Sequence, residues 1–231
     1  MRSLLFSNIK HMKVNVYVDG FNLYYGALKG TPYKWLDLSK LAEAYLPAGT
    51  QLRTIKYFTA DVSGRVFNPD QPYRQQAYLR ALKTIPHLKI IKGSFLSHPV
   101  RMPAADQNGR GQRVTVSLLG LKIRMRLPPT DEHGRVQLLS VIKTEEKGSD
   151  VNLAAHLVHD ACNGRFDMAV VVSNDTDLFE SLRIVTKEMK MPVVILNPFP
   201  QNNLKLSRIA PVKRIRKAAL AVCQFPDVVS S

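Results

Sequence analysis

Two aspartates in one turn are the clearest chemical signal in the sequence. Asp175 and Asp177 lie in the segment Ser173–Asp177, which follows the apolar run Met168–Val172 and precedes a helical pattern. Their carboxylates are therefore expected together at the carboxyl end of a strand. Carboxylate oxygens are the ligands that Mg²⁺ and Mn²⁺ prefer. Such a metal can activate water, neutralise phosphoryl oxygens and stabilise the leaving group during phosphodiester hydrolysis.

Two further stretches repeat this strand-to-helix arrangement. Asp19 and Asn22 follow the strand pattern Val14–Val18, and Asp150 opens another helical pattern. If the strands are parallel neighbours, all four aspartates converge at the carboxyl ends, where open α/β sheets bind ligands. Four carboxylates in one pocket repel one another, and a divalent metal relieves that repulsion. The expected ligands of Mg²⁺ or Mn²⁺ are Asp19, Asp150 and Asp175, with Asp177 binding a second ion or orienting water.

Each of these residues also has an ordinary structural explanation. A single aspartate after a strand is more often a helix N-cap than a metal ligand, and a cap explains Asn22 as well as a contact with a phosphate does. Lys147, which precedes a glycine and a helix start, is either a phosphate contact or a solvated lysine. Ser173 fits a turn or a cap, and Glu180 fits a salt bridge on the helix surface.

Apolar periodicity predicts alternating strands and helices along most of the chain. Strands are expected at residues 14–18, 54–59, 88–91, 169–172 and 193–196, with a further strand at 135–143. Helical patterns are expected at residues 22–28, 36–45, 73–85, 151–161 and 178–190. This alternation predicts an α/β fold in which a mostly parallel sheet lies between two helical layers.

Residues 96–135 interrupt the alternation, because prolines and glycines flank two short runs of period two. We interpret this segment as an inserted β-hairpin. Within Leu121–Leu127, the period of two places Lys122, Arg124 and Arg126 on one face. We expect this basic stripe to contact an RNA backbone beside the acidic site. An ordinary solvated face or a dimer contact would give the same pattern.

The chain is strongly basic, which favours a polyanionic partner. Its 231 residues carry a formal net charge of +15 with a pI near 10.0, and 45% of them are apolar, as suits one globular domain. An acidic cluster within a basic surround is typical of an enzyme that acts on nucleic acid. The basic tail, residues 201–231, is predicted to be helical and packed on the domain. Its charges either contact nucleic acid or form a solvated face.

Cysteine spacing and apolar runs bear on the cellular setting. Cys162 and Cys223 are far apart and lack zinc-ligand spacing, so we expect neither a zinc site nor a disulfide, and a reducing cytoplasm is the default. Residues 1–12 are expected to be an extension rather than a signal peptide. No apolar run reaches the roughly 18 residues of a membrane span. The sequence leaves the oligomeric state open, a homodimer included.

The segments Val18–Tyr25, Glu146–Leu153 and Val172–Leu178 together resemble the motifs of the NYN domain family, LabA-like branch, which belongs to the PIN-like nucleases. The resemblance covers residues 13–200. It implies a PIN-like three-layer α/β/α sandwich and a divalent-metal-dependent ribonuclease. The site residues that it implies are Asp19, Asp150, Asp175 and Asp177, with Asn22 as a polar neighbour.

The sequence departs from the family pattern at two places. Asn174 stands where the family more often has glycine, and we expect an asparagine in the left-handed conformation to preserve the turn. Residues 96–135 do not match the pattern, so their role is not inherited from the family.

The predicted function is the hydrolysis of single-stranded RNA by a cytoplasmic, metal-dependent endoribonuclease. A non-catalytic RNA-binding module of the same fold is the alternative from another class, although the presence of all four aspartates argues against it. DNA stays open as a substrate, because phosphate contacts do not distinguish it from RNA. A phosphatase of the HAD type is disfavoured, because Asp19 is not followed by a second aspartate two residues later.

Overall fold

The structure, a computed structural model, describes residues 11–64, 68–104, 112–118, 121–127, 130 and 132–226, with the backbone alone described for 112–118 and 121–127. The chain forms two compact units: residues Leu96–Glu145 make up one, and Met1–Phe95 with Glu146–Ser231 make up the other. The larger unit contains the predicted site. The expected extension at residues 1–12 lies almost entirely outside the described residues.

A six-stranded sheet runs through the larger unit in the order β10-β9-β8-β1-β2-β3, and every neighbouring pair is parallel. Its strands are β1 (Lys13–Asp19), β2 (Gln51–Thr59), β3 (Leu88–Lys92), β8 (Met168–Val172), β9 (Val193–Asn197) and β10 (Val212–Arg214). All five strands predicted for this sheet are present. The sheet confirms the predicted α/β class.

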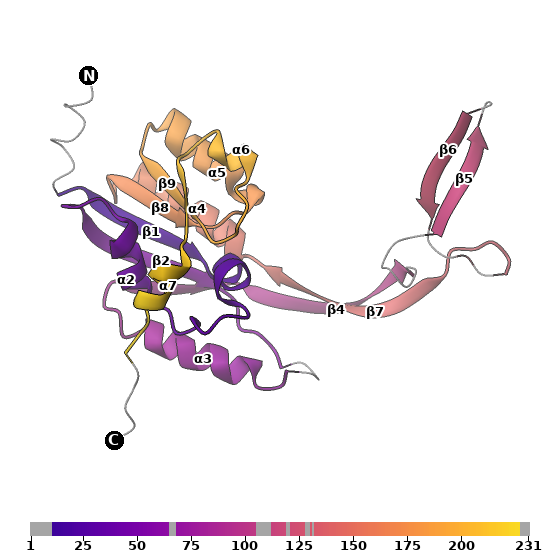
Figure 1. Cartoon of the computed structure of the whole chain (residues 1–231), viewed down its shortest axis with the longest axis horizontal. Helices are drawn as coiled ribbons and strands as arrows, with labels where there is room; N and C mark the ends of the chain where they lie inside the picture. Colours follow the sequence, from indigo (N-terminus) through magenta and orange to yellow (C-terminus); the bar gives the residue numbers. More distant parts are fainter. Residues whose placement is uncertain are drawn as a thin grey trace. The chain divides into compact units, whose positions relative to one another are not determined.

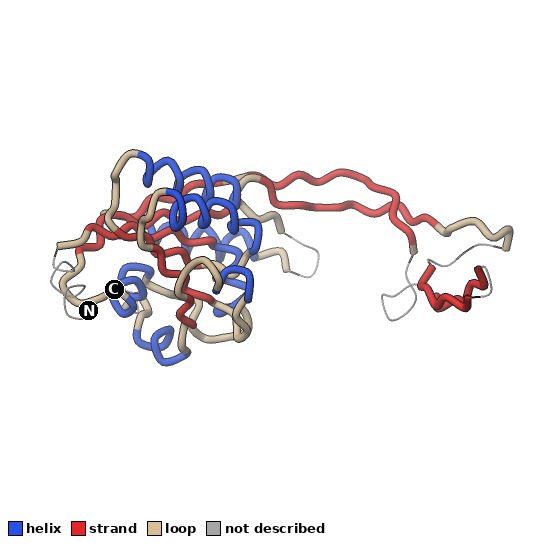
Figure 2. The backbone as a smooth tube through the Cα atoms, turned by 90° about the horizontal axis from the view of Figure 1, so that it is seen from above, coloured by secondary structure: helices blue, strands red, loops and turns tan. Residues whose placement is uncertain are grey.

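Helices cover both faces of this sheet, so the unit is a three-layer sandwich (Figures 1 and 2). One layer contains α1 (Gly20–Leu23), which continues as the π-helical turn η1 (Tyr24–Leu28), together with α2 (Leu38–Tyr45), α3 (Gln71–Leu82) and α7 (Lys217–Val222). The other layer contains α4 (Ser149–Cys162), α5 (Phe179–Arg183) flanked by the helical turns η2 (Thr176–Leu178) and η3 (Ile184–Glu188), and α6 (Leu204–Ser207).

Strand β1 shows why the sequence forms a buried central strand. Val14, Val16 and Val18 pack into the core on the side of α2 and α3, whereas Tyr17 packs into the core beneath α4. Side chains alternate between the two faces of a strand, so a strand covered on both faces needs apolar residues at nearly every position. Three β-branched valines and Tyr17 meet that need in Val14–Val18, with Asn15 as a buried polar exception.

The order of the strands places a crevice between β1 and β8. From β1 the chain proceeds through β2 to β3 on one side, and from β8 it proceeds through β9 to β10 on the other. Helix α4 makes the crossover that precedes β8. The carboxyl ends of β1 and β8 therefore flank the topological switch point, which is where open α/β sheets bind ligands.

The inserted unit is larger than the predicted hairpin at 96–135. It contains two strand pairs: β4 (Ser94–Pro103) pairs with β7 (Leu138–Lys147), and β5 (Gln112–Leu118) pairs with β6 (Leu121–Leu127). The strand predicted at 135–143 is the β7 strand, and it returns along β4 rather than joining the central sheet. The insertion extends to Glu145 because β7, which follows the predicted hairpin, pairs with β4.

The strand that carries the basic stripe is present, and its side chains lie outside the described residues. Strand β6 runs antiparallel to β5, with Lys122, Arg124 and Arg126 opposite Ser117, Thr115 and Arg113. The contact expected between the basic stripe and RNA stays a prediction.

The tail is not the continuous helix that was expected. It forms α6, then β10, then α7, and β10 pairs with β9, so the strand predicted at 193–196 is not the last of the sheet. Pro211 explains the interruption, because proline cannot continue a helix and its carbonyl here accepts a hydrogen bond from the Ile195 N–H. Leu206, Ile215 and Leu220 are buried. In the described part of the chain, no helix is long and apolar enough to cross a membrane.

The packing of α7 predicts that the tail contributes to stability. Leu220 is buried in the core, whereas Val222 on the same helix is 75% exposed. Replacing Leu220 by Ala should lower the free energy of unfolding by about 2–4 kcal/mol, because apolar burial decreases and a cavity forms. Val222→Ala should change it by less than about 0.5 kcal/mol. Urea denaturation measures both, and equal effects would show that α7 is not part of the folded core.

Candidate metal site

Three of the predicted aspartates meet at the switch point. Asp19, Asp150 and Asp175 each offer a carboxylate oxygen, and the three oxygens lie within 4.8 Å of one another. Asp19 is almost fully buried, at 3% exposure, and the other two are half-buried. Asp177 lies outside this trio. Its charge still contributes to the raised pKa of Asp150, although burial, Asp175 and Glu146 contribute more.

Two members of the trio are helix N-caps as well. Asp19 Oδ1 accepts the Asn22 N–H at 2.9 Å and so begins α1, and Asp175 Oδ1 accepts the Asp177 N–H at 3.0 Å and so begins η2. Capping by one carboxylate oxygen fixes the rotamer of each aspartate and leaves the second oxygen outside the cap. The second oxygen of Asp19 accepts one hydrogen bond, from Ser173, and a carboxylate oxygen has a further lone pair. The structural and the chemical roles of these aspartates are therefore compatible.

Asp150 reaches the site by a different route from the one predicted. It lies in the first turn of α4, and the strand before it, β7, belongs to the insertion rather than to the central sheet. Gly148 precedes this helix with a φ of 97°, a conformation that glycine adopts without strain. The site is thus built from two strand ends and one helix start.

Ser173 links the carboxylate of Asp19 to the backbone of Asp175, which sequence reasoning did not foresee. Its hydroxyl donates to Asp19 Oδ2 at 3.1 Å, and its Oγ accepts the Asp175 N–H at 3.1 Å. Only 1% of Ser173 is exposed, so this link is shielded from water. Its position directly after a buried strand was the available signal, although a turn residue would occupy the same position.

Asn22 and Asn174 tie the loops around the site together. Asn22 Oδ1 accepts the Asn174 N–H at 2.8 Å, and Asn174 Oδ1 accepts the Asn203 N–H at 3.2 Å. Asn174 does not adopt the left-handed conformation that was expected: the non-glycine residues with positive φ in the described chain are His11 and Lys190. The turn is preserved by these side-chain hydrogen bonds instead.

Glu146 is a further acidic residue that sequence reasoning left out. Its Oε1 accepts the Ser149 N–H at 3.0 Å at the start of α4. A Cβ atom on Gly93 would lie 2.8 Å from that oxygen and 2.5 Å from the Lys147 carbonyl, so glycine is required where the end of β3 approaches this turn. An acid three residues before a helix start was the signal.

Burial and mutual repulsion raise the pKa values of Asp19 and Asp150. Burial, with the charges of Asp150 and Asp175, raises the pKa of Asp19 to about 7. Burial, with the charges of Asp175, Glu146 and Asp177, raises the pKa of Asp150 to about 6. Among the described residues, the groups that hydrogen-bond to Asp19 are the neutral Asn22 N–H and Ser173 hydroxyl.

A second buried aspartate on the same side of the sheet shows what cationic partners do. Asp160 is fully buried, yet it accepts hydrogen bonds from Lys56 at 2.5 Å, Tyr17 at 2.7 Å and Arg165 at 3.1 Å. Burial alone would raise the pKa of Asp160, but these partners more than offset burial and lower it. The pKa values of Asp19 and Asp150 shift the opposite way, upward, and an all-carboxylate set suits Mg²⁺ or Mn²⁺.

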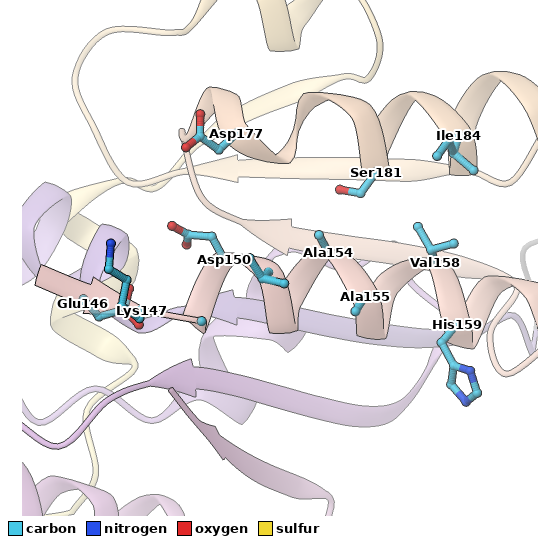
Figure 3. Close-up of a pocket in the computed structure, with 12 residues that line it drawn as sticks. Glu146, Lys147, Asp150, Ala154, Ala155, Val158, His159, Asp177, Ser181 and Ile184 are labelled. Atoms are coloured by element: carbon cyan, nitrogen blue, oxygen red, sulfur yellow. The ribbon is translucent and has the colours of Figure 1, made fainter. Parts of the chain in front are cut away.

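A cavity of about 740 Å³ opens from the site along the groove between α4 and α5 (Figure 3). Asp150 and Asp177 stand at one end of the two helices, near Glu146 and Lys147, and His159 stands at the other (Figure 3). The wall between them is formed by Val151, Ala154, Ala155, Val158, Ser181 and Ile184. Lys147 therefore lines the acidic end of the cavity.

Glu180, by contrast, pairs with Arg183 at 2.6 Å, as expected of a surface salt bridge.

Comparison with known proteins identifies the family. The chain is 31% identical, over 242 aligned residues, to the 6-hydroxy-3-succinoylpyridine 3-monooxygenase HspA of Pseudomonas putida (strain DSM 28022 / S16), a match covering 94% of this chain and 72% of that protein. The chain belongs to the HspA family. The name of this relative is that of an enzyme, so the family includes an enzyme. No family model matches the sequence.

A solved structure supports the fold. The crystal structure of a protein of unknown function, VPA0982 from Vibrio parahaemolyticus RIMD 2210633, has a TM-score of 0.51 to this chain at 14% identity. The match covers 94% of this chain and 98% of that one. At this level of identity the match bears on the fold alone.

The raised pKa of Asp19 predicts a pH-dependent effect of Asp19→Asn. In metal-free protein, folded Asp19 keeps its proton up to a pH near 7, whereas the unfolded chain releases it near pH 4. The folded state binds more protons between these values, so the wild type loses stability as pH rises through that window. Asparagine does not titrate, so the variant should gain up to about 2–4 kcal/mol relative to wild type between pH 4 and pH 8.

Denaturation in EDTA at several pH values measures this difference. Asp61→Asn is the control, because the Lys92 partner lowers the pKa of Asp61 and its removal should bring no gain at high pH. A difference between wild type and Asp19→Asn that stays constant with pH would contradict the account.

Proposed function

We propose that this protein hydrolyses phosphodiester bonds in single-stranded RNA, as an endonuclease that depends on Mg²⁺ or Mn²⁺. The observation that carries the proposal is the trio of carboxylate oxygens within 4.8 Å at the switch point of a chain with a net charge of +15. A polyanion is attracted to such a chain, and a cation between the acids and a phosphate removes the remaining repulsion.

The residues of the site have separable roles in this proposal. Asp19, Asp150 and Asp175 hold the metal, which when bound activates water and neutralises charge on the phosphoryl oxygens. The Asn22 N–H and the Ser173 hydroxyl fix the orientation of the Asp19 carboxylate. Asp177 at the acidic end of the cavity accepts a proton from the attacking water, and Lys147 at the same end contacts a phosphate.

The choice of RNA rests on the resemblance to the NYN domain. Phosphate contacts do not distinguish RNA from DNA, so the trio alone supports a nuclease without indicating whether its substrate contains ribose or deoxyribose.

The basic stripe Lys122, Arg124 and Arg126 would bind backbone phosphates. Replacing any one of these three side chains by alanine should reduce the salt dependence of binding by roughly 0.7 in log–log slope for single strands. The cytoplasm remains the compartment that we propose for this activity.

A second candidate function comes from the relative. HspA is named a 6-hydroxy-3-succinoylpyridine 3-monooxygenase, and the cavity beside the trio has the size and apolar wall of a small-molecule pocket. Insertion of oxygen into a hydroxypyridine is therefore the alternative. Hydrolysis comes first because redox iron and copper sites usually use histidine or cysteine, and the trio contains carboxylates alone.

Replacing one trio member should separate these candidates. Asp175→Asn should reduce Mg²⁺- or Mn²⁺-dependent cleavage of single-stranded RNA by at least about 100-fold, because the metal loses a charged ligand. Glu180→Gln is the matched control, since Glu180 lies on the same helical segment and pairs with Arg183 instead of joining the trio. Cleavage is followed on labelled RNA and DNA, with EDTA as a blank.

Parallel reactions with 6-hydroxy-3-succinoylpyridine, O₂ and a reduced nicotinamide test the second candidate. Conversion of that compound without cleavage of RNA or DNA would replace the first candidate by the second. Cleavage by Asp175→Asn at the wild-type rate would remove the trio from the mechanism. Binding of RNA by wild type without metal-dependent cleavage would favour a non-catalytic RNA-binding protein.

A further inference from the structure

Two exposed tyrosines lie on the helix that Asp19 begins. Tyr24 is 37% exposed and Tyr25 is 50% exposed, although both are large aromatic residues. Their ring centroids are 5.3 Å apart at an interplanar angle of 77°, so the rings meet edge to face. In this arrangement they support each other while part of their aromatic surface stays open to solvent.

The helix beneath these rings is closely packed against the domain. Leu23 and Leu28 are buried in the core. A Cβ atom on Gly26 would lie 2.8 Å from the Phe199 ring, so glycine is required for the approach of this helix to that loop. At the other end, the Asn22 N–H donates a hydrogen bond to Asp19, and the Asn22 side chain accepts one from the Asn174 N–H. The tyrosines therefore project from a backbone that is fixed relative to the trio.

A positive charge accompanies the rings. Lys29 Nζ lies 4.9 Å from the centroid of the Tyr25 ring, within the range of a cation–π interaction. Proteins that bind single-stranded nucleic acid combine aromatic rings, on which bases stack, with basic residues that follow the phosphates. Tyr24, Tyr25 and Lys29 supply both components on one short segment.

We propose that Tyr24, Tyr25 and Lys29 form a stacking platform for the bases of a single-stranded nucleic acid. This inference rests on the proposed function and names the part of the protein that selects single strands. Five or six residues separate the rings from Asp19, about 8–9 Å along a helix axis. A strand whose phosphate lies at the trio thus has a neighbouring base within reach of the rings.

The platform explains a preference for single strands without contacts to base edges. In a duplex the base faces are already stacked on one another, whereas an unpaired strand offers them to an aromatic surface. Stacking is tolerant of sequence, because every base has a π face. The platform therefore does not distinguish RNA from DNA.

Binding to a labelled single-stranded RNA tests the platform, measured by fluorescence anisotropy in the Asp175→Asn background so that cleavage does not interfere. Tyr25→Ala, and Tyr25→Leu which keeps apolar bulk without a planar face, should each weaken binding about 5- to 100-fold. Tyr25→Phe should bind within about two-fold of the parent, because the ring is retained. Tyr73→Ala is the matched control: this tyrosine is 76% exposed on α3, and its removal should leave affinity unchanged.

Two comparisons separate stacking from general charge attraction. The tyrosine variants should bind double-stranded RNA as the parent does and should keep the parent's salt dependence. Lys29→Ala should instead lower the log–log salt slope by roughly 0.7. Parent-like affinity of Tyr25→Ala and Tyr25→Leu for single-stranded RNA would overturn the platform, and so would an equal loss of affinity for single and double strands.

The outcomes for the platform and for hydrolysis can be told apart. If wild type cleaves RNA and the tyrosine variants bind normally, the nuclease stands and the platform is rejected. If the tyrosine variants lose single-strand binding and wild type cleaves nothing, the platform stands and hydrolysis is rejected.

Discussion

Repulsion among buried carboxylates is the constraint on which the site depends. Asp19, Asp150 and Asp175 place oxygens within 4.8 Å of one another, and the burial of Asp19 with the partial burial of the other two limits the water that screens their charges. Asp160, on helix α4, is fully buried and is compensated by Lys56 and Arg165. A divalent cation is the partner that we propose for the other three acids.

The fold holds the three acids together by using them as structural residues. Asp19 and Asp175 are helix caps, so the hydrogen bonds that start α1 and η2 also prevent these carboxylates from turning away from each other. Ser173 joins the two, and Asn22 joins the loops that carry them. Asp150 is delivered by the first turn of α4, the crossover helix to β8. The free-energy cost of repulsion among the carboxylates is thus offset by hydrogen bonds that also stabilise the sandwich.

The sequence predicts the central sheet well because its strands are apolar on both faces. Met168–Val172 is a continuous apolar run, and Val14–Val18 is one apart from the polar Asn15. A capping aspartate follows each, so both the strand and the turn carry local signals. Strand β10 carries no such signal: its residues, Val212–Arg214, are one valine and two cations, and its pairing with β9 is a tertiary event. The same holds for the pairing of β4 with β7 in the insertion.

The candidate site divides in the same way. The convergence of Asp19 and Asp175 could be predicted from position alone, because aspartates after neighbouring strands at a switch point meet. Ser173 and Glu146 could not, because their roles depend on which partner lies across the site. The element that positions Asp150 could not be predicted either, because that required knowing that β7 pairs outside the central sheet.

The most direct test of the central claim is an anomalous difference map from crystals soaked in Mn²⁺ near pH 8, above the raised pKa values of Asp19 and Asp150. The account predicts a single strong peak, or two adjacent peaks, within about 2.0–2.3 Å of carboxylate oxygens from Asp19, Asp150 and Asp175. Soaked crystals that show no peak at the trio, or a peak that contacts neither Asp19 nor Asp175, would contradict it.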